Sequence, residues 1–231
     1  MDIQIRRAGE RGGANHGWLN TKHTFSFADY HDPAFMGFRS LRVINEDRVA
    51  ADRGFGRHPH ANMEILTYVL EGELAHQDSM GNGSVIRPGD VQRMTAGTGV
   101  THSEMNPNKH EAVHFYQIWI VPAAQGLAPG YEQKAFPDRT GKLHVVASPD
   151  GRDGSVTVHQ DMTLAAAVLA PGEQVEHVVG KDRHVWIQVA KGTIKLGEHE
   201  LVAGDGVAVT GAGSLSIEAR AASEVLVFDL A

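Results

Sequence analysis

Short apolar runs, separated by turn residues, extend along the whole chain. Gly, Pro, Asn and Asp punctuate these runs at short intervals, and Pro122 closes the strongest one. The five clearest runs are residues 65–70, 113–121, 185–189, 207–209 and 225–230. No long stretch has the 3.6-residue period of an amphipathic helix, although a short helix over residues 161–168 stays open as an alternative. The pattern predicts an all-β protein of barrels or sandwiches rather than alternating βα units.

The chain also repeats itself. In the second half, a strand, a Gly turn, a strand, a Gly-Asp turn and a final strand return in the same order. The recurring segments are 68–72 and 188–192, 86–91 and 201–206, and the Gly-x-Gly motifs at 97–99 and 211–213. This recurrence predicts two duplicated β-barrels. The Ala-, Gly- and Pro-rich stretch 122–130 marks their boundary, so we expect one domain over residues 1–125 and another over residues 126–231.

Composition and charge argue against several classes of function. The 231 residues carry a net charge of −7 without a long basic run, which argues against a general nucleic-acid or anionic-membrane surface. There is no Cys, so disulfides and thiolate metal sites are excluded. The first seven residues lack an apolar signal core, and no stretch reaches the ~20 apolar residues that span a bilayer. We therefore expect a soluble, cytoplasmic protein.

Two short motifs carry the candidate chemistry: His58-Pro59-His60 and His102-Ser103-Glu104. Residues i and i+2 of a strand point to the same face, so each motif can aim two ligand-type side chains into one cavity. Two such strands facing each other offer three imidazoles and one carboxylate, a set suited to a divalent transition metal. Such a set leaves two positions free at an octahedral metal or fills a tetrahedral zinc shell, so both an open and a closed site remain compatible.

The repeat provides an internal control for these motifs. Matching Gly72 to Gly192 places Val178 and Gly180 opposite His58 and His60. Matching Asp90 to Asp205 places Ile217 and Glu218 near the positions of His102 and Glu104. The second half has no His-x-His, so we expect only the first domain to keep a complete metal set.

The surrounding residues resemble a known superfamily. Residues 54–64, which include His58 and His60, resemble the first cupin motif. Residues 88–90 and 97–106 resemble the second. Residues 23–27, 35–38, 71–72 and 76–79 are similar to the pirin family, densely over residues 11–121 and more weakly to the C-terminus. The resemblance implies two tandem cupin, jelly-roll-like β-barrels (a bicupin). It also implies that the metal ligands are His58, His60, His102 and Glu104.

Glu64 stands at a position where the general cupin pattern and the pirin pattern differ. The general cupin pattern takes its acidic ligand from this position, whereas the pirin pattern takes it from the position of Glu104. Glu64 could then hold an imidazole N–H or a bound water and serve as a base. The alternative is a buried, hydrogen-bonded strand residue.

The remaining polar and aromatic residues suit structural or cavity-lining roles. For His114 we expect a structural or solvent-facing role, on a different strand face from Gln117. His76 and Asp78 share a face, and a polar strand end is the simpler interpretation. The N-terminal segment with His16 and His23 could cover the barrel mouth. Its aromatic residues would serve core packing or form a pocket wall: Phe25, Phe27, Phe35 and Phe38.

Two functions from different classes fit these features. Similar bacterial pirins act on flavonols, so the resemblance implies a quercetin 2,3-dioxygenase that takes a flavonol and dioxygen and releases carbon monoxide. Glu104 or Glu64 would accept the substrate proton. The metal would be iron first, with Zn, Co, Ni, Mn or Cu also suited to the donor set. The alternative is a metal- or redox-responsive regulatory protein with a transcription-related protein partner, as in animal pirins.

Overall fold

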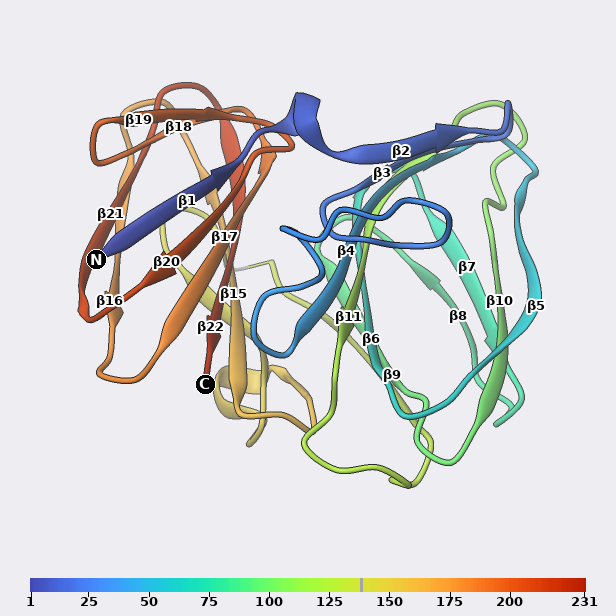
Figure 1. Cartoon of the computed structure of the whole chain (residues 1–231). Coiled ribbons are helices and arrows are strands. Elements are labelled where there is room, and N and C mark those ends of the chain that lie inside the picture. The colour runs from blue at the N-terminus through green and yellow to red at the C-terminus, as the bar shows by residue number, and fades with distance from the viewer. Residues whose placement is uncertain (138) are drawn as a thin grey trace. The chain divides into compact units, whose positions relative to one another are not determined.

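The computed structural model describes residues 1–137 and 139–231, and most of them lie in antiparallel strands, numbered β1 to β22 (Figure 1). The expected all-β architecture is confirmed. The two helical elements in this part of the chain are short 3₁₀ turns, at Ala8–Glu10 and Arg152–Gly154. Residues 162–169, near the open helix alternative, form strand β15 instead. None of the described residues form a helix that is long and apolar enough to cross a membrane.

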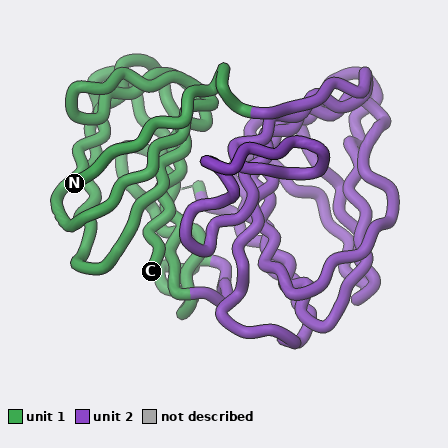
Figure 2. Tube along the Cα trace, viewed as in Figure 1, with its two compact units in different colours: residues 1–11, 137–155, 161–231 green, residues 12–136, 156–160 purple. Residues whose placement is uncertain are grey.

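The chain forms two compact units, coloured purple and green in Figure 2. The purple unit, here called the first barrel, contains residues 12–136 and 156–160. Its strands are β2 (Gly12–Asn15), β3 (Leu19–His23), β4 (Leu41–Val49), β5 (Gly54–His60), β6 (Glu64–Glu71), β7 (Leu74–Asp78), β8 (Gly83–Ile86), β9 (Asp90–Thr95), β10 (Val100–Met105), β11 (Val113–Ile120), β12 (Gly130–Ala135) and β14 (Val156–Thr157).

The green unit, here called the second barrel, contains residues 1–11, 137–155 and 161–231, of which residue 138 lies outside the described part. Its strands are β1 (Asp2–Arg6), β13 (His144–Ser148), β15 (Met162–Leu169), β16 (Gln174–Val179), β17 (His184–Lys191), β18 (Thr193–Leu196), β19 (His199–Val202), β20 (Gly206–Thr210), β21 (Gly213–Ala219) and β22 (Ser223–Leu230).

Both barrels combine a long and a short antiparallel sheet with the same internal strand order. The long sheet runs β12-β9-β6-β11-β4-β3-β2 in the first barrel, and the second barrel contributes β1-β20-β17-β22-β15-β13 to the other seven-stranded sheet. The short sheet runs β5-β10-β7-β8 in the first and β16-β21-β18-β19 in the second. The duplication read from the sequence is therefore present strand by strand, with β6 matching β17 and β10 matching β21.

The edge strands of the long sheets shift the domain limits away from the expected 125/126 division. β1 pairs with β20, with Ile3 opposite Val209, so the first residues of the chain complete the second barrel. β12 pairs with β9, with Tyr131 opposite Met94, and takes the same edge position in the first barrel. The ladder hydrogen bonds of an edge strand decide its domain, and an apolar pattern does not reveal which ladder a strand joins.

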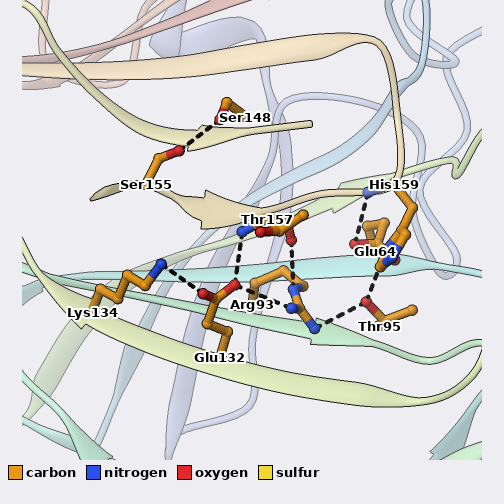
Figure 3. A network of polar contacts seen from close by, with 9 residues as sticks. All are labelled: Glu64, Arg93, Thr95, Glu132, Lys134, Ser148, Ser155, Thr157 and His159. Atoms are coloured by element: carbon orange, nitrogen blue, oxygen red, sulfur yellow. Dashed lines mark hydrogen bonds and ion pairs between the residues drawn. The ribbon is translucent and has the colours of Figure 1, made fainter. Parts of the chain in front are cut away.

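A polar network fixes residues 156–160 in the first barrel (Figure 3). Arg93 on β9 donates from Nε to the Thr157 carbonyl at 2.7 Å and from Nη2 to the Glu132 carboxylate at 3.2 Å. The Thr157 N–H donates to the same carboxylate at 2.7 Å, and Lys134 forms an ion pair with Glu132 at 2.7 Å. Charge-assisted bonds of this kind hold a segment that is distant in sequence.

Candidate metal centre and cavity

The predicted histidine pairs meet inside the first barrel, on the adjacent strands β5 and β10 (Figure 1). His102 lies directly opposite His58, and Val100 opposite His60. The ring centroids of the three histidines are 4.4 to 4.9 Å apart. One ring nitrogen of each lies within 4.8 Å of the others, a spacing that fits a shared metal ion.

Hydrogen bonding and burial prepare these imidazoles as neutral ligands. His58 Nδ1 donates to the Gly56 carbonyl at 2.7 Å, which leaves the Nε2 lone pair for a metal. Burial, with His58 nearby, lowers the pKa of His60 to about 4. Burial also lowers the pKa of His102 to about 2, with smaller contributions from His58, His60 and His76. No described residue hydrogen-bonds to the buried Nε2 of His102, so this atom suits a ligand role.

Glu104 is buried next to His102 in a polar setting that sequence reasoning missed. Gln117 on β11 donates from Nε2 to both carboxylate oxygens of Glu104, at 3.1 and 3.0 Å. The Gln117 Oε1 atom accepts a bond from the Thr67 hydroxyl at 2.9 Å, so the amide orientation is fixed. Burial raises the pKa of Glu104 to about 7 despite these bonds, with Asp47 adding to the rise. The carboxyl can therefore exchange a proton near neutral pH.

The interpretation as a polar strand end fits Asp78, which ends β7 and accepts bonds from the Met80 and Asn82 N–H groups, whereas His76 is buried inside the barrel. His76 Nδ1 lies 3.4 Å from His102 Nδ1, and His76 Nε2 lies 3.5 Å from an Asp78 oxygen. His76, His102 and Glu104 form a second close group of possible ligand atoms. The short sheet brings β7 beside β10, so His76 Nδ1 can accept a hydrogen bond from the His102 Nδ1–H group and hold that ring in place.

A cavity of about 440 Å³ opens onto this cluster. Its lining includes His58, His60 and Glu104, together with His16 and His23 from the N-terminal segment that was expected to cover the mouth. Phe27 and Trp119 form one wall, with ring centroids 5.4 Å apart in an edge-to-face arrangement. Phe25 is instead a buried core residue, and the half-buried Phe35 and Phe38 belong neither to the core nor to the lining of this cavity. The cavity combines aromatic walls with a few convergent polar groups, as small-molecule sites do.

The structure places Glu64 away from this cavity. Thr67 faces Gln117, and Glu64, three residues earlier on β6, points to the opposite face of the sheet. Its buried carboxylate contacts His159 Nδ1 at 3.3 Å and accepts a weak bond from the His159 N–H at 3.4 Å (Figure 3). The base role considered for Glu64 is therefore not supported, and the buried, hydrogen-bonded alternative describes it. His114 likewise faces away and contacts Glu46 at 2.9 Å.

The same period-two alternation in the sequence also marks polar residues on two other strands whose interior faces line the cavity. Gln117 and Trp119 share the cavity face of β11, and Asn45 and Asp47 share the cavity face of β4. Each pair interrupts an otherwise apolar interior face with a hydrogen-bonding group. Burial raises the pKa of Asp47 to about 7, against a hydrogen bond from Thr21.

Two cupin barrels, of which the first surrounds a His/Glu cluster, define the chain as a bicupin. Residues 4–120 match the pirin family, and residues 145–230 match the quercetinase C-terminal cupin domain. The chain belongs to the pirin family.

Similar proteins cover its full length. The quercetin 2,3-dioxygenase of Escherichia coli (strain K12) is 54% identical over 228 residues, 99% of this chain and 98% of that protein. The crystal structure of YhhW from Escherichia coli has a TM-score of 0.96 at 53% identity, over 100% of this chain and 98% of that one. The structure of the bacterial pirin YhhW in complex with nickel(II) has a TM-score of 0.95 at 52% identity, over 99% of both chains.

Proposed function

We propose that this chain is a metal-dependent quercetin 2,3-dioxygenase that cleaves the central ring of flavonols. The observation that carries this proposal is the cluster of His58, His60, His102 and Glu104 at an aromatic-walled cavity. The full-length similarity to a quercetin 2,3-dioxygenase supports the substrate class.

The donor set fits one divalent transition metal. Burial lowers the pKa of His60 and His102, and a hydrogen bond fixes the tautomer of His58. The three neutral imidazoles are borderline ligands that suit several first-row ions, and the harder carboxylate offsets part of the charge of a dication. A relative of known structure binds nickel(II), which supports a divalent ion, and we propose iron as the resident metal. When bound, the metal supplies Lewis-acid polarisation of the substrate oxygens and a site for oxygen chemistry.

The side chains of the cavity supply proton transfer. Glu104 accepts the proton of the substrate's 3-hydroxyl, a role that suits a carboxylate that lines the cavity beside the histidines. Gln117 holds both Glu104 oxygens, so the carboxylate keeps one orientation while its protonation changes. His76 and Asp78 orient His102 from the other side.

The cavity walls supply orientation and exclude water. Phe27 and Trp119 offer faces and edges for a planar ring system, and Trp119 also packs against His60, with ring centroids 5.1 Å apart. In the overall reaction both atoms of dioxygen enter the ring-opened product, and one carbon of the central ring leaves as carbon monoxide. A dry, shaped cavity protects such a reaction from side reactions with water.

The regulatory alternative is not favoured. The full-length relative carries the name of an enzyme, and the cluster lies inside a cavity of small-molecule size.

The proposal is tested by anaerobic reconstitution of the metal-free protein with Fe, Mn, Co, Ni, Cu or Zn. Each form receives quercetin and dioxygen, and carbon monoxide is measured together with loss of the substrate. We expect carbon monoxide in stoichiometric yield from the iron form. If no metal form releases it, the proposed activity is wrong.

A further inference from the structure

A polar pair interrupts the interior face of strand β4. Its odd-numbered residues point into the first barrel, and Asn45 and Asp47 stand between Val43 and Val49 on that face. Their exposed fractions are only 4% and 5%, and both side chains line the cavity. Neither belongs to the groups of side chains that could share a metal.

Each of these side chains presents an unsatisfied acceptor. Within residues 1–137 and 139–231, nothing hydrogen-bonds to the buried Oδ1 of Asn45 or the buried Oδ1 of Asp47. Their neighbours are already engaged, because Gln117 is bound to Thr67 and Glu104, and the Thr21 bond to Asp47 leaves Oδ1 without a partner. Buried polar atoms are nearly always paired in folded proteins, so two orphan acceptors on one cavity wall indicate a ligand with hydrogen-bond donors.

The second barrel shows that the fold does not require polar residues at these positions. The matched strands β6 and β17 align Thr67 with Ile187, and the ladders then align Gln117 with Val227. The same ladders place Ala165 and Ala167 at the positions of Asn45 and Asp47. These four positions are aliphatic in the second barrel and polar in the first barrel, which has the cavity. The polar side chains therefore indicate ligand recognition rather than core packing.

The chemistry of the wall identifies the ligand group. Two oxygen acceptors, one from a carboxyl, favour O–H or N–H donors and disfavour anionic groups. Leu19, Phe27 and Phe55 line the same cavity with apolar surface suited to a flat aromatic ring. We propose that Asn45 and Asp47 form a subsite that accepts hydrogen bonds from phenolic hydroxyls of the substrate other than the 3-hydroxyl that reacts. The inference rests on the proposed function, since it assigns the second recognition element of the same cavity.

A pair of ligands tests the subsite without catalysis. Quercetin carries phenolic hydroxyls on its outer rings, whereas 3-hydroxyflavone keeps only the reacting hydroxyl and its neighbouring carbonyl. Binding of both is measured by calorimetry under anaerobic conditions in the zinc-loaded protein. We expect quercetin to bind about 10- to 100-fold more tightly, because the analogue leaves buried acceptors unpaired.

Variants of β4 assign this preference to the two residues. In Asp47→Leu and Asn45→Leu the preference for quercetin should fall toward unity, with a larger loss for quercetin than for 3-hydroxyflavone. Asp47→Asn keeps one acceptor oxygen in the same shape and should give an intermediate ratio. Arg48→Gln is the matched control, because Arg48 lies on the same strand with a half-exposed side chain, and its ratio should equal that of the wild type.

The outcomes separate the two proposals. Equal affinity of the wild type for both ligands, or a preference that survives in folded Asp47→Leu and Asn45→Leu, overturns the subsite while leaving the flavonol activity standing. Absence of binding by either flavonol overturns the proposed function and the subsite with it. Because the ligand comparison uses the wild-type protein, a variant that fails to fold does not prevent a decision.

Discussion

The interiors of the two barrels differ far more than their folds. The first barrel holds two half-buried histidines, the buried His102 and Glu104, and further buried polar residues around a cavity. The second barrel keeps the same strand order, but its corresponding interior is a continuous aliphatic cluster of Val, Leu, Ile and Ala. The comparison teaches that the ladder hydrogen bonds and turns build the barrel, whereas a few interior side chains decide between a site and a core.

The strand register refines which residues correspond. In the second barrel Leu215 lies opposite His177, as His102 lies opposite His58 in the first. Leu215 and Ile217 therefore take the positions of His102 and Glu104. The expected match of Val178 and Gly180 to the histidine pair was displaced by one residue, since Val178 is 71% exposed and points outward. A one-residue slip on a strand moves a side chain to the other face.

The largest expected effect is the loss of metal from the first barrel alone. His60→Ala should remove most of the metal, a larger loss than the ~10–100-fold typical of an outer partner, because only three proposed ligands remain. His177→Ala changes the corresponding strand of the second barrel and should keep full metal content. Metal analysis after dialysis measures both variants. Stoichiometric metal in the His60 variant would contradict the ligand assignment.

The second prediction concerns the pH dependence of the metal-free protein. The Glu104 pKa is raised from 4.5 to about 7 by burial, so the folded state binds the proton more tightly than the unfolded chain. The stability from this carboxyl is fully present below pH 4.5 and is lost as pH rises to 7. The loss amounts to about 3 kcal/mol, since one pKa unit corresponds to ~1.4 kcal/mol. Glu104→Gln should remove this part of the slope in urea unfolding measured from pH 4.5 to 8.

Asp229 in the second barrel supplies the opposite sign. Burial acts to raise its pKa, but bonds from His177 and Arg183 outweigh burial and lower that pKa below 3.8. Its contribution is therefore present above pH 3.8 and is lost as the pH falls further. Asp229→Asn should lower the free energy of unfolding at pH 7. An unchanged pH slope in Glu104→Gln, or a stabilised Asp229→Asn, would contradict this contrast.

A smaller effect is expected at His76, which contacts the proposed ligand His102. His76→Gln removes the imidazole beside His102 and should weaken metal binding by about 10- to 100-fold without changing the stoichiometry at saturation. Competition with a chelator measures the affinity. Gln77→Ala, at the exposed neighbouring position of β7, is the matched control. Equal affinities of the two variants would show that His76 does not position His102.

The smallest effect is expected at Glu64. Glu64→Gln weakens the contacts with His159 on the far face of β6 and should lower the free energy of unfolding by about 1 kcal/mol. Metal content and carbon monoxide release should stay at wild-type levels. Urea unfolding and the activity assay check the two parts, and a loss of activity in the folded variant would return Glu64 to the mechanism.

The strands and the duplication could be predicted from the sequence because both follow local rules. Apolar runs between turn residues located β6, β11, β17 and β22, and the recurring Gly turns located the repeat. Strand β15 stayed ambiguous, since an Ala-rich apolar segment of eight residues fits a buried strand or a short helix. The same-face rule brought His58, His60 and His102 together correctly.

The sequence by itself determined which side chains share a strand face, because the period of two is a property of each strand alone. Only the tertiary structure decided which faces meet. It set His76 against His102, directed Glu64 away from the cavity, and left Asn45 and Asp47 as buried acceptors on its wall. It also assigned β1 to the second barrel. Contacts between strands depend on ladder partners and register, which many distant residues fix together and no local pattern contains.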